Sequence, residues 1–190
     1  MKKILAVSVV LIFQSLFSAY AQKAGEVNLK NLTKDEKAKL ESAEFFYSEE
    51  SYLRALPLYI DLMSAHPEEK YFKMKSGICY LSKSDEKEKA LNLFLDIRNT
   101  DPHYPDLNFY LGRAYHLNYK FEEAIAAFNT YLTESPAPSV NQKLLANRYI
   151  ENSKNAKVFV ELKIQCDITN IGDVINTENQ EYVPVISSDE

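Results

Sequence analysis

The sequence has few of the residues from which most catalytic and metal sites are built. It contains no tryptophan, four glycines, two cysteines and three histidines. The glycines do not form a phosphate-binding loop, and the motifs GxSxG, HExxH and GxxxxGK do not occur. No histidine has a second ligand at metal-site spacing; these histidines are His66, His103 and His116. We therefore predict no catalytic residue, no cofactor and no metal.

Two cysteines are also too few for a disulfide scaffold or a zinc site. Cys79 and Cys166 lie far apart in the sequence. They could form one disulfide in an oxidising compartment, or each could be a small apolar residue of the core. The sequence leaves both interpretations open, and core packing is the simpler one.

Beyond its first residues the chain lacks any apolar run near the roughly 20 residues that a membrane-spanning helix needs. The start, "MKKILAVSVVLIFQSLFSAYAQ", has two lysines, an apolar stretch and the small-residue pattern Ala19-Tyr20-Ala21. This is typical of a secretory signal peptide over residues 1–21, with the mature chain starting near Gln22; an uncleaved anchor is the alternative. We expect an exported protein of the periplasm, with or without association with the outer membrane.

A basic block is missing as well. The chain has 22 Lys and Arg against 27 Asp and Glu, a formal net charge of −5. Proteins that bind nucleic acids usually need clustered basic side chains to contact the phosphates. We therefore expect no nucleic acid among the partners of this chain.

The sequence does contain a repeat. Ala55, Ala90 and Ala124 are 35 and 34 residues apart, and each is followed 12 residues later by a proline. Small and aromatic residues recur around them at matching spacing: Ala43, Gly77 and Gly112; Phe46, Tyr80 and Tyr115; Tyr59, Phe94 and Phe128. This spacing predicts two antiparallel helices per repeat that cross at the small residue, with the proline at the end of the second helix.

The pattern resembles the tetratricopeptide repeat over Glu36 to Pro138, most closely in the copy "NFYLGRAYHLNYKFEEAIAAFNTYLTESP". The resemblance implies an all-α fold, a right-handed α–α superhelix of three helical hairpins and a capping helix over residues 33–155, after a linker at 22–32. Helices are expected at 33–48, 51–65, 67–82, 85–99, 105–118, 121–134 and 139–154. Helix starts are indicated by capping boxes at Thr33–Glu36 and Ser139–Gln142, and by Pro67, Asp85 with Glu88, and Pro105.

The same resemblance implies a groove lined by the first helix of each hairpin, which in this family often holds a peptide. Our candidate protein-binding residues are Tyr47, Tyr71, Lys75, Asp106, Tyr110 and Arg113. Tyr and Arg are residue types that often carry binding energy. The wider set on this face also contains Leu40, Glu44, Met74, Ile78 and Phe109, and the longer apolar members could equally be core between repeats.

Residues 156–190 differ from the rest of the chain. "KIQCDITN" alternates apolar and polar residues like a strand, and a lone strand is not stable in water. "NIGDVIN" and "EYVPVISSDE" resemble the start of the WD-like β-propeller that follows such repeats in exported envelope proteins. Proteins of that kind commonly end in a peptidoglycan-binding OmpA-like domain, and some serve type IX secretion and gliding. We therefore interpret this tail as the start of a truncated propeller, with peptidoglycan contact only through a missing C-terminal domain.

Two functions fit these features. The first is a non-enzymatic envelope scaffold or adaptor that binds another envelope protein or a peptide segment, contacts the membrane only through that partner and has no small-molecule substrate. The alternative is a structural spacer whose repeats present a propeller and a wall-binding domain that are missing from this chain. An enzyme that depends on one of the three histidines is the third hypothesis.

Overall fold

The structure is a computed structural model that describes residues 31–83, 85–134 and 137–162. These residues form seven α-helices and no strand. In chain order the helices are α2 (Lys34–Ser48), α3 (Tyr52–Ala65), α4 (Lys70–Tyr80), α5 (Lys87–Thr100), α6 (Leu107–Leu117), α7 (Phe121–Leu132) and α8 (Val140–Glu161). The predicted all-α fold is confirmed for the described residues. The predicted signal peptide and the strands predicted after residue 162 lie outside them.

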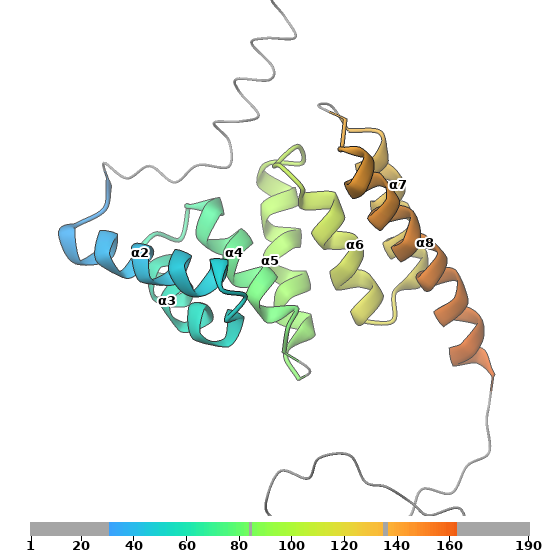
Figure 1. Cartoon of the computed structure of the whole chain (residues 1–190), viewed down its shortest axis with the longest axis horizontal. Helices are drawn as coiled ribbons and strands as arrows, with labels where there is room; N and C mark the ends of the chain where they lie inside the picture. The colour runs from blue at the N-terminus through green and yellow to red at the C-terminus, as the bar shows by residue number, and fades with distance from the viewer. Residues whose placement is uncertain (1–30, 84, 135–136, 163–190) are drawn as a thin grey trace, which may run out of the picture. The chain divides into compact units, whose positions relative to one another are not determined.

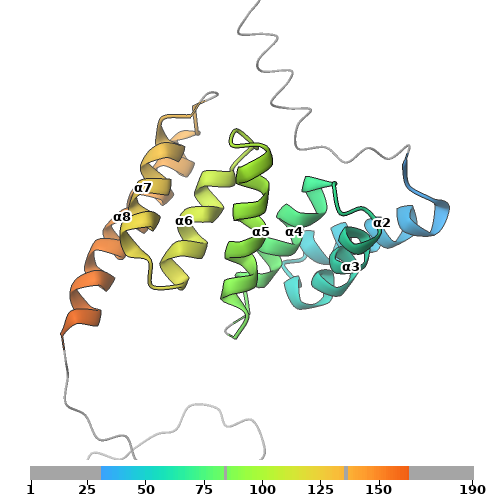
Figure 2. The same ribbon diagram turned by 180° about the vertical axis from the view of Figure 1, so that it is seen from behind.

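From α2 to α7, each helix packs against the next one along the chain (Figure 1 and, from behind, Figure 2). The connections are short, so neighbouring helices run in opposite directions. α8 attaches to α6 and α7 through side chains. The ring of Tyr149 stacks on that of Phe128 at 5.4 Å, and Nδ1 of His116 lies 2.9 Å from Oγ of the buried Ser153.

Small residues let the helices of each hairpin approach closely. A Cβ atom added to Gly112 would lie 2.7 Å from both Cε1 and Cζ of Phe128, and one added to Gly77 would lie 2.5 Å from Cε1 of Phe94. Real Cβ atoms do not come so close to another carbon, so both positions favour glycine. Most of the other repeat residues are fully buried: Ala43, Ala55, Tyr59, Ala90, Phe94, Ala124 and Phe128. Tyr80 and Tyr115 are also buried, whereas Phe46 is half-buried.

Helix starts agree with the sequence in two places. The Thr33 side chain accepts a hydrogen bond from the Glu36 amide, and the Glu36 carboxylate accepts one from the Thr33 amide. Ser139 and Gln142 form the second predicted capping box. The predicted starts of the first and the last helix are therefore confirmed.

The predicted starts of α4, α5 and α6 are wrong by two or three residues, whereas α7 begins at Phe121 as predicted. α4 begins at Lys70 and not at Pro67, because Glu69 is its capping residue. α6 begins at Leu107, after Asp106, whose φ of 56° is left-handed and cannot continue a helix. α5 follows Glu86, and its start has no side-chain cap, so the predicted cap at Asp85 does not form.

The capping helix is longer than predicted. α8 ends at Glu161 and not at 154, so residues 156–161 are helical although their sequence suggested the beginning of the tail. A helix satisfies its backbone hydrogen bonds within one segment, whereas a strand needs a partner strand. The described part of the chain offers no strand for these residues to pair with, and the helix simply continues.

Candidate protein-binding surface

An ion pair between Glu44 and Lys75 joins the first hairpin to the second. Glu44 lies on α2 and Lys75 on α4, and the Lys75 Nζ is 3.1 Å from Oε2 of Glu44. Oε1 of Glu44 accepts hydrogen bonds from the hydroxyls of Tyr59 on α3, at 2.6 Å, and Tyr71 on α4, at 2.5 Å. One carboxylate therefore gathers donors from two other helices, and hydrogen bonds to a charged group are stronger than neutral ones.

Aromatic rings surround the ammonium group of Lys75. Its Nζ lies 3.6 Å from the ring centroid of Tyr47 and 5.3 Å from that of Tyr71. A cation over a ring face is attracted by the negative face of the π system. The Tyr47 ring also packs edge-on against Tyr52 and Tyr59. Lys75 is thus held by a carboxylate and two rings, and only 16% of its side chain is exposed.

This environment sets the protonation of the cluster. Burial acts to raise the pKa of Glu44, but hydrogen bonds from Tyr59 and Tyr71 and the charge of Lys75 outweigh it, so the pKa is lowered. Burial and the Glu44 carboxylate raise the pKa of both tyrosine hydroxyls. Near neutral pH the carboxylate is therefore ionised, and the hydroxyls stay protonated as donors.

The thiol of Cys79 lies beneath this cluster and is fully buried. Burial raises its pKa to about 12, and the nearby Glu44 carboxylate adds to that effect against the charge of Lys75. A thiol must ionise to act as a nucleophile, so Cys79 is unreactive at neutral pH. The core interpretation of Cys79 is confirmed, whereas Cys166 lies outside the described residues.

The cluster continues onto α6. Tyr110 lies close enough to Tyr47 to contribute, after burial, to the raised pKa of the Tyr47 hydroxyl. The guanidinium of Arg113 lies 5.9 Å from the ring centroid of Tyr110 and 5.8 Å from that of Tyr149 on α8. The first helices of the three hairpins thus contribute to one continuous set of side chains. We call it the tyrosine–lysine surface, and it consists of Glu44, Tyr47, Tyr71, Lys75, Tyr110 and Arg113.

Asp106, the remaining candidate, lies at the edge of this surface. It precedes α6, and its carboxylate accepts a hydrogen bond from the Tyr131 hydroxyl on α7 at 3.2 Å. Its charge also acts, after burial, to raise the pKa of Tyr110. The structure therefore gives Asp106 a partner within its own hairpin, and it does not join the Glu44–Lys75 centre.

The wider candidate set divides between surface and core. Leu40, Met74 and Ile78 are buried, so they belong to the core between helices. Phe109 is half-buried, and its ring packs against Phe128, Tyr131 and Tyr149. Three further tyrosines contact the tyrosine–lysine surface without having been chosen from the sequence: Tyr52, Tyr59 and Tyr149. The repeat pattern marked Tyr59 as a core aromatic, but it did not show that its hydroxyl reaches Glu44.

Comparisons of the chain with models of protein families, with curated proteins and with solved structures found no match. In the part of the chain that the structure describes, no helix is both long enough and apolar enough to span a membrane.

Proposed function

We propose that this chain is a non-enzymatic scaffold of the cell envelope, with tetratricopeptide-like hairpins in a right-handed superhelix, that binds a segment of another envelope protein. The observation that carries the proposal is the tyrosine–lysine surface. Its tyrosines come from the first helix of each hairpin and are half-buried, so each presents part of a ring to solvent. The signal-peptide pattern at residues 1–21 supports export to the periplasm.

The contacts within this surface suit binding because they hold it in place before any partner arrives. Tyr71 is fixed by its hydrogen bond to Glu44, and Tyr47 by the ammonium of Lys75. A preordered side chain loses little conformational entropy on binding. Because Lys75 is already neutralised by Glu44, the surface offers mainly ring faces and hydroxyls, together with the positive charge of Arg113. We therefore propose a partner segment with apolar or aromatic side chains and free backbone groups.

The test is site-specific photo-crosslinking in cells that express the full chain. A benzophenone amino acid is placed at Tyr110, within the surface, or at Tyr119, which is 70% exposed in the turn between α6 and α7. The proposal predicts a discrete crosslinked protein from the first position and none from the second. The crosslink should be lost when Tyr71 and Arg113 are both replaced by alanine.

Equal crosslinking from both positions, or none from Tyr110, would count against a binding role for this surface. Tyr119→Asn serves as a matched control for the alanine substitutions at Tyr71 and Arg113. Tyr119 has φ of 59°, and asparagine tolerates the left-handed conformation well. That variant should leave crosslinking from Tyr110 unchanged.

A second candidate function is that of a spacer, in which the helical hairpins only carry further domains. The resemblance of "NIGDVIN" and "EYVPVISSDE" to a propeller start favours it, and both lie outside the described residues. Sequencing the gene past the codon of Glu190 distinguishes the two. A reading frame that continues into more strands and an OmpA-like domain favours the spacer, whereas a stop codon together with a crosslink at Tyr110 favours the adaptor.

A further inference from the structure

The two faces of α8 differ in what covers them. One face is packed onto the hairpins and contains the buried residues Ala146, Ile150 and Ser153. The opposite face is solvent-exposed and carries Val140, Leu144, Arg148, Glu151, Asn155, Val158 and Phe159. Each of its four apolar side chains is more than half exposed. We call these seven residues the outer stripe of α8.

The outer stripe follows the periodicity of a helix that contacts another helix. With about 100° between successive residues, its members fall within roughly 100° of one another around the helix axis. From Leu144 the spacing to Arg148, Glu151, Asn155 and Val158 is four, three, four and three residues. This is the spacing of a helix that packs lengthwise against a second helix, with apolar residues here only at the outer positions and polar ones at the three middle positions. The stripe therefore has the spacing for a partner helix and a polar centre.

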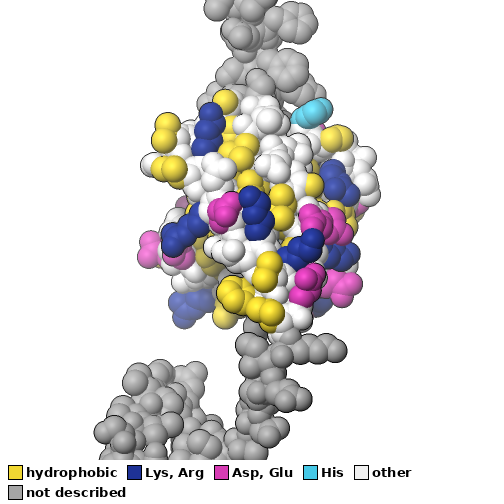
Figure 3. All heavy atoms as spheres, turned by 90° about the vertical axis from the view of Figure 1, so that its right-hand side faces the viewer, with side chains coloured by type: hydrophobic (Ala, Val, Ile, Leu, Met, Phe, Trp, Pro, Cys, Tyr) yellow, Lys and Arg dark blue, Asp and Glu magenta, His cyan; other side chains and the backbone are white. Residues whose placement is uncertain are grey.

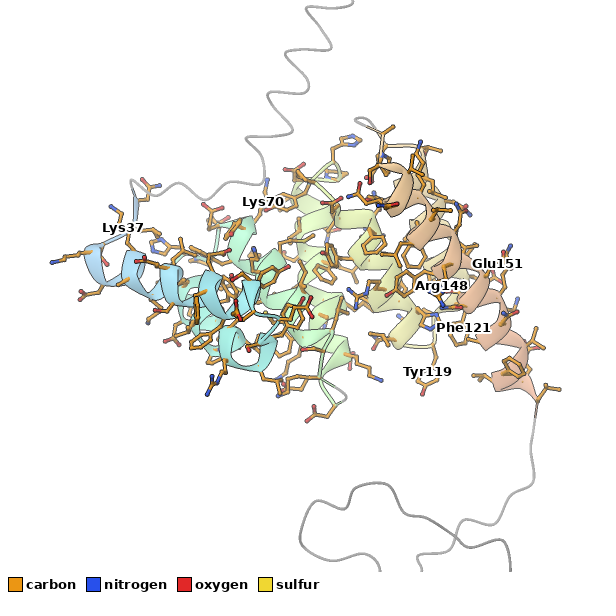
Figure 4. All side chains as sticks on the ribbon, viewed as in Figure 1. Lys37, Lys70, Tyr119, Phe121, Arg148 and Glu151 are labelled. Carbon is orange, nitrogen blue, oxygen red and sulfur yellow. The ribbon has the colours of Figure 1, made fainter. Side chains whose placement is uncertain are left out.

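Charge divides the stripe into three parts. Val140 and Leu144 lie near one end of α8, and Val158 and Phe159 lie near the other. Arg148 and Glu151, labelled in Figure 4, lie between them. Figure 3 views this side of the molecule, where hydrophobic side chains are interspersed with basic and acidic ones. The stripe thus has apolar ends and one positive and one negative charge near the middle. When two copies of it run antiparallel, apolar ends meet and opposite charges meet.

The reversed pattern is complementary at the two charged residues and at the apolar residues of the two ends. If two copies of α8 run antiparallel about a two-fold axis level with the Tyr149–Ile150 bond, Val140 faces Phe159, Leu144 faces Asn155 and Arg148 faces Glu151 of the other copy. A two-fold interface requires this reciprocity, because residue i contacts j wherever j contacts i. The stripe from Val140 to Phe159 spans about 28 Å at 1.5 Å per residue. The opposite charges would meet twice, once on each side of the axis.

We propose that the outer stripe is a homodimer interface in which α8 packs antiparallel against α8 of a second copy of this chain. The charges near its centre support this occupant. Arg148 has no ion-pair or hydrogen-bond partner among residues 31–83, 85–134 and 137–162, whereas Glu151 pairs with Lys154 at 2.8 Å. The Glu151 carboxylate can still accept hydrogen bonds from a second cation, because Lys154 contacts only one of its oxygens. A second copy supplies both the apolar cover and the missing anion for Arg148.

Sedimentation velocity of the full chain tests the interface, over protein concentrations from about 1 μM to about 1 mM. The wild-type chain should shift from monomer to dimer. Arg148→Glu and Glu151→Arg each place like charges opposite one another, and each should raise the dimer Kd at least about tenfold. The double variant Arg148→Glu/Glu151→Arg restores opposite charges with exchanged positions. Its Kd should return to within about threefold of the wild-type value.

Lys37→Glu is the matched control, because it reverses an exposed charge on α2, away from α8. It should leave the dimer Kd unchanged. Circular dichroism at low concentration checks that every variant folds. A wild-type chain that is monomeric at all concentrations overturns the proposal, and this includes the case in which residues 163–190 or a different protein cover the stripe. A dimer that is insensitive to the single reversals, or one that the double variant does not restore, overturns it equally.

Discussion

Glu44 on α2 and Arg148 on α8 are both charged residues on helix surfaces, but their surroundings differ. Glu44 is contacted by the side chains of Tyr59, Tyr71 and Lys75 from the next two helices. Arg148 lies on the last described helix, where no further helix follows within residues 137–162. Both helices lie at an end of the described stack, so the face on which each residue lies makes the difference. Glu44 lies on the face of α2 that meets α3 and α4, whereas Arg148 lies on the face of α8 that no described helix covers. A charge is therefore satisfied within the chain where its face packs against neighbouring helices.

The largest effect on stability is expected at the helix crossing of the third hairpin. We expect Gly112→Leu to lower the free energy of unfolding by about 3 kcal/mol, because the new side chain must displace the Phe128 ring or separate α6 from α7. Urea denaturation followed by circular dichroism measures the change. Leu145→Met, on a partly exposed position of α8, is the control and should change stability little. An unchanged midpoint for Gly112→Leu would contradict the assigned crossing.

Alanine at the two charged positions compares them directly. Glu44→Ala removes the acceptor for two tyrosine hydroxyls and leaves Lys75 without its anion, so we expect a loss of about 1–3 kcal/mol. Arg148→Ala should change the stability of the monomer by no more than about 0.5 kcal/mol. Both are measured by urea denaturation at low protein concentration. Equal effects would show that Glu44 is no better satisfied by its neighbours than Arg148 is.

The attachment of α8 itself is a smaller test. Oγ of Ser153 donates its hydrogen to the Tyr149 carbonyl, so it must accept the hydrogen bond from Nδ1–H of His116. Ser153→Ala leaves this half-buried donor without its partner and should cost about 1 kcal/mol. Hydrogen exchange should speed up mainly in α8, with less change in α2 to α5. Uniform acceleration along all helices would show that α8 does not open separately.

The smallest expected effect is a dependence on pH. The pKa of Glu44 is lowered in the folded chain, so its carboxylate contributes stability above the unfolded pKa of about 4.5, and this contribution is lost as the pH falls through the folded value. Glu44→Gln removes the titrating group but keeps an acceptor. The free energy of unfolding of this variant should therefore fall less than that of the wild type between about pH 5 and about pH 3. Parallel pH profiles for the two proteins would contradict the assigned role of Glu44.

The helical hairpins could be predicted from the sequence because their signals are local. Gly77, Gly112 and the repeated alanines and aromatics are spaced by the geometry of two crossing helices. The predicted helix starts were less accurate. Proline and acidic residues are common in the first turn of a helix and also in the loop before it, so they do not fix the first helical residue. Asp106 has a left-handed backbone conformation, and only glycine is a strong sequence signal for that conformation.

The candidate surface was only partly predictable. The sequence placed Tyr47, Tyr71, Lys75, Tyr110 and Arg113 on the first helices, and the structure shows that they are neighbours. The sequence could not show that Glu44 joins them by accepting hydrogen bonds from Tyr59 and Tyr71. The contact with Tyr71 depends on how the first two hairpins stack. The extension of α8 to Glu161 was missed because Val and Phe favour strands when a partner strand exists.

By itself the sequence determined that this chain forms helices in pairs, because small and aromatic residues at fixed spacing favour one way of crossing within each hairpin. Only the tertiary structure decided which charges are satisfied. Glu44 finds its donors on α3 and α4, because the stacking of the hairpins brings distant residues within hydrogen-bond distance. Arg148 lies on the face of α8 that no described helix covers, and this follows from the position of α8 at the end of the stack.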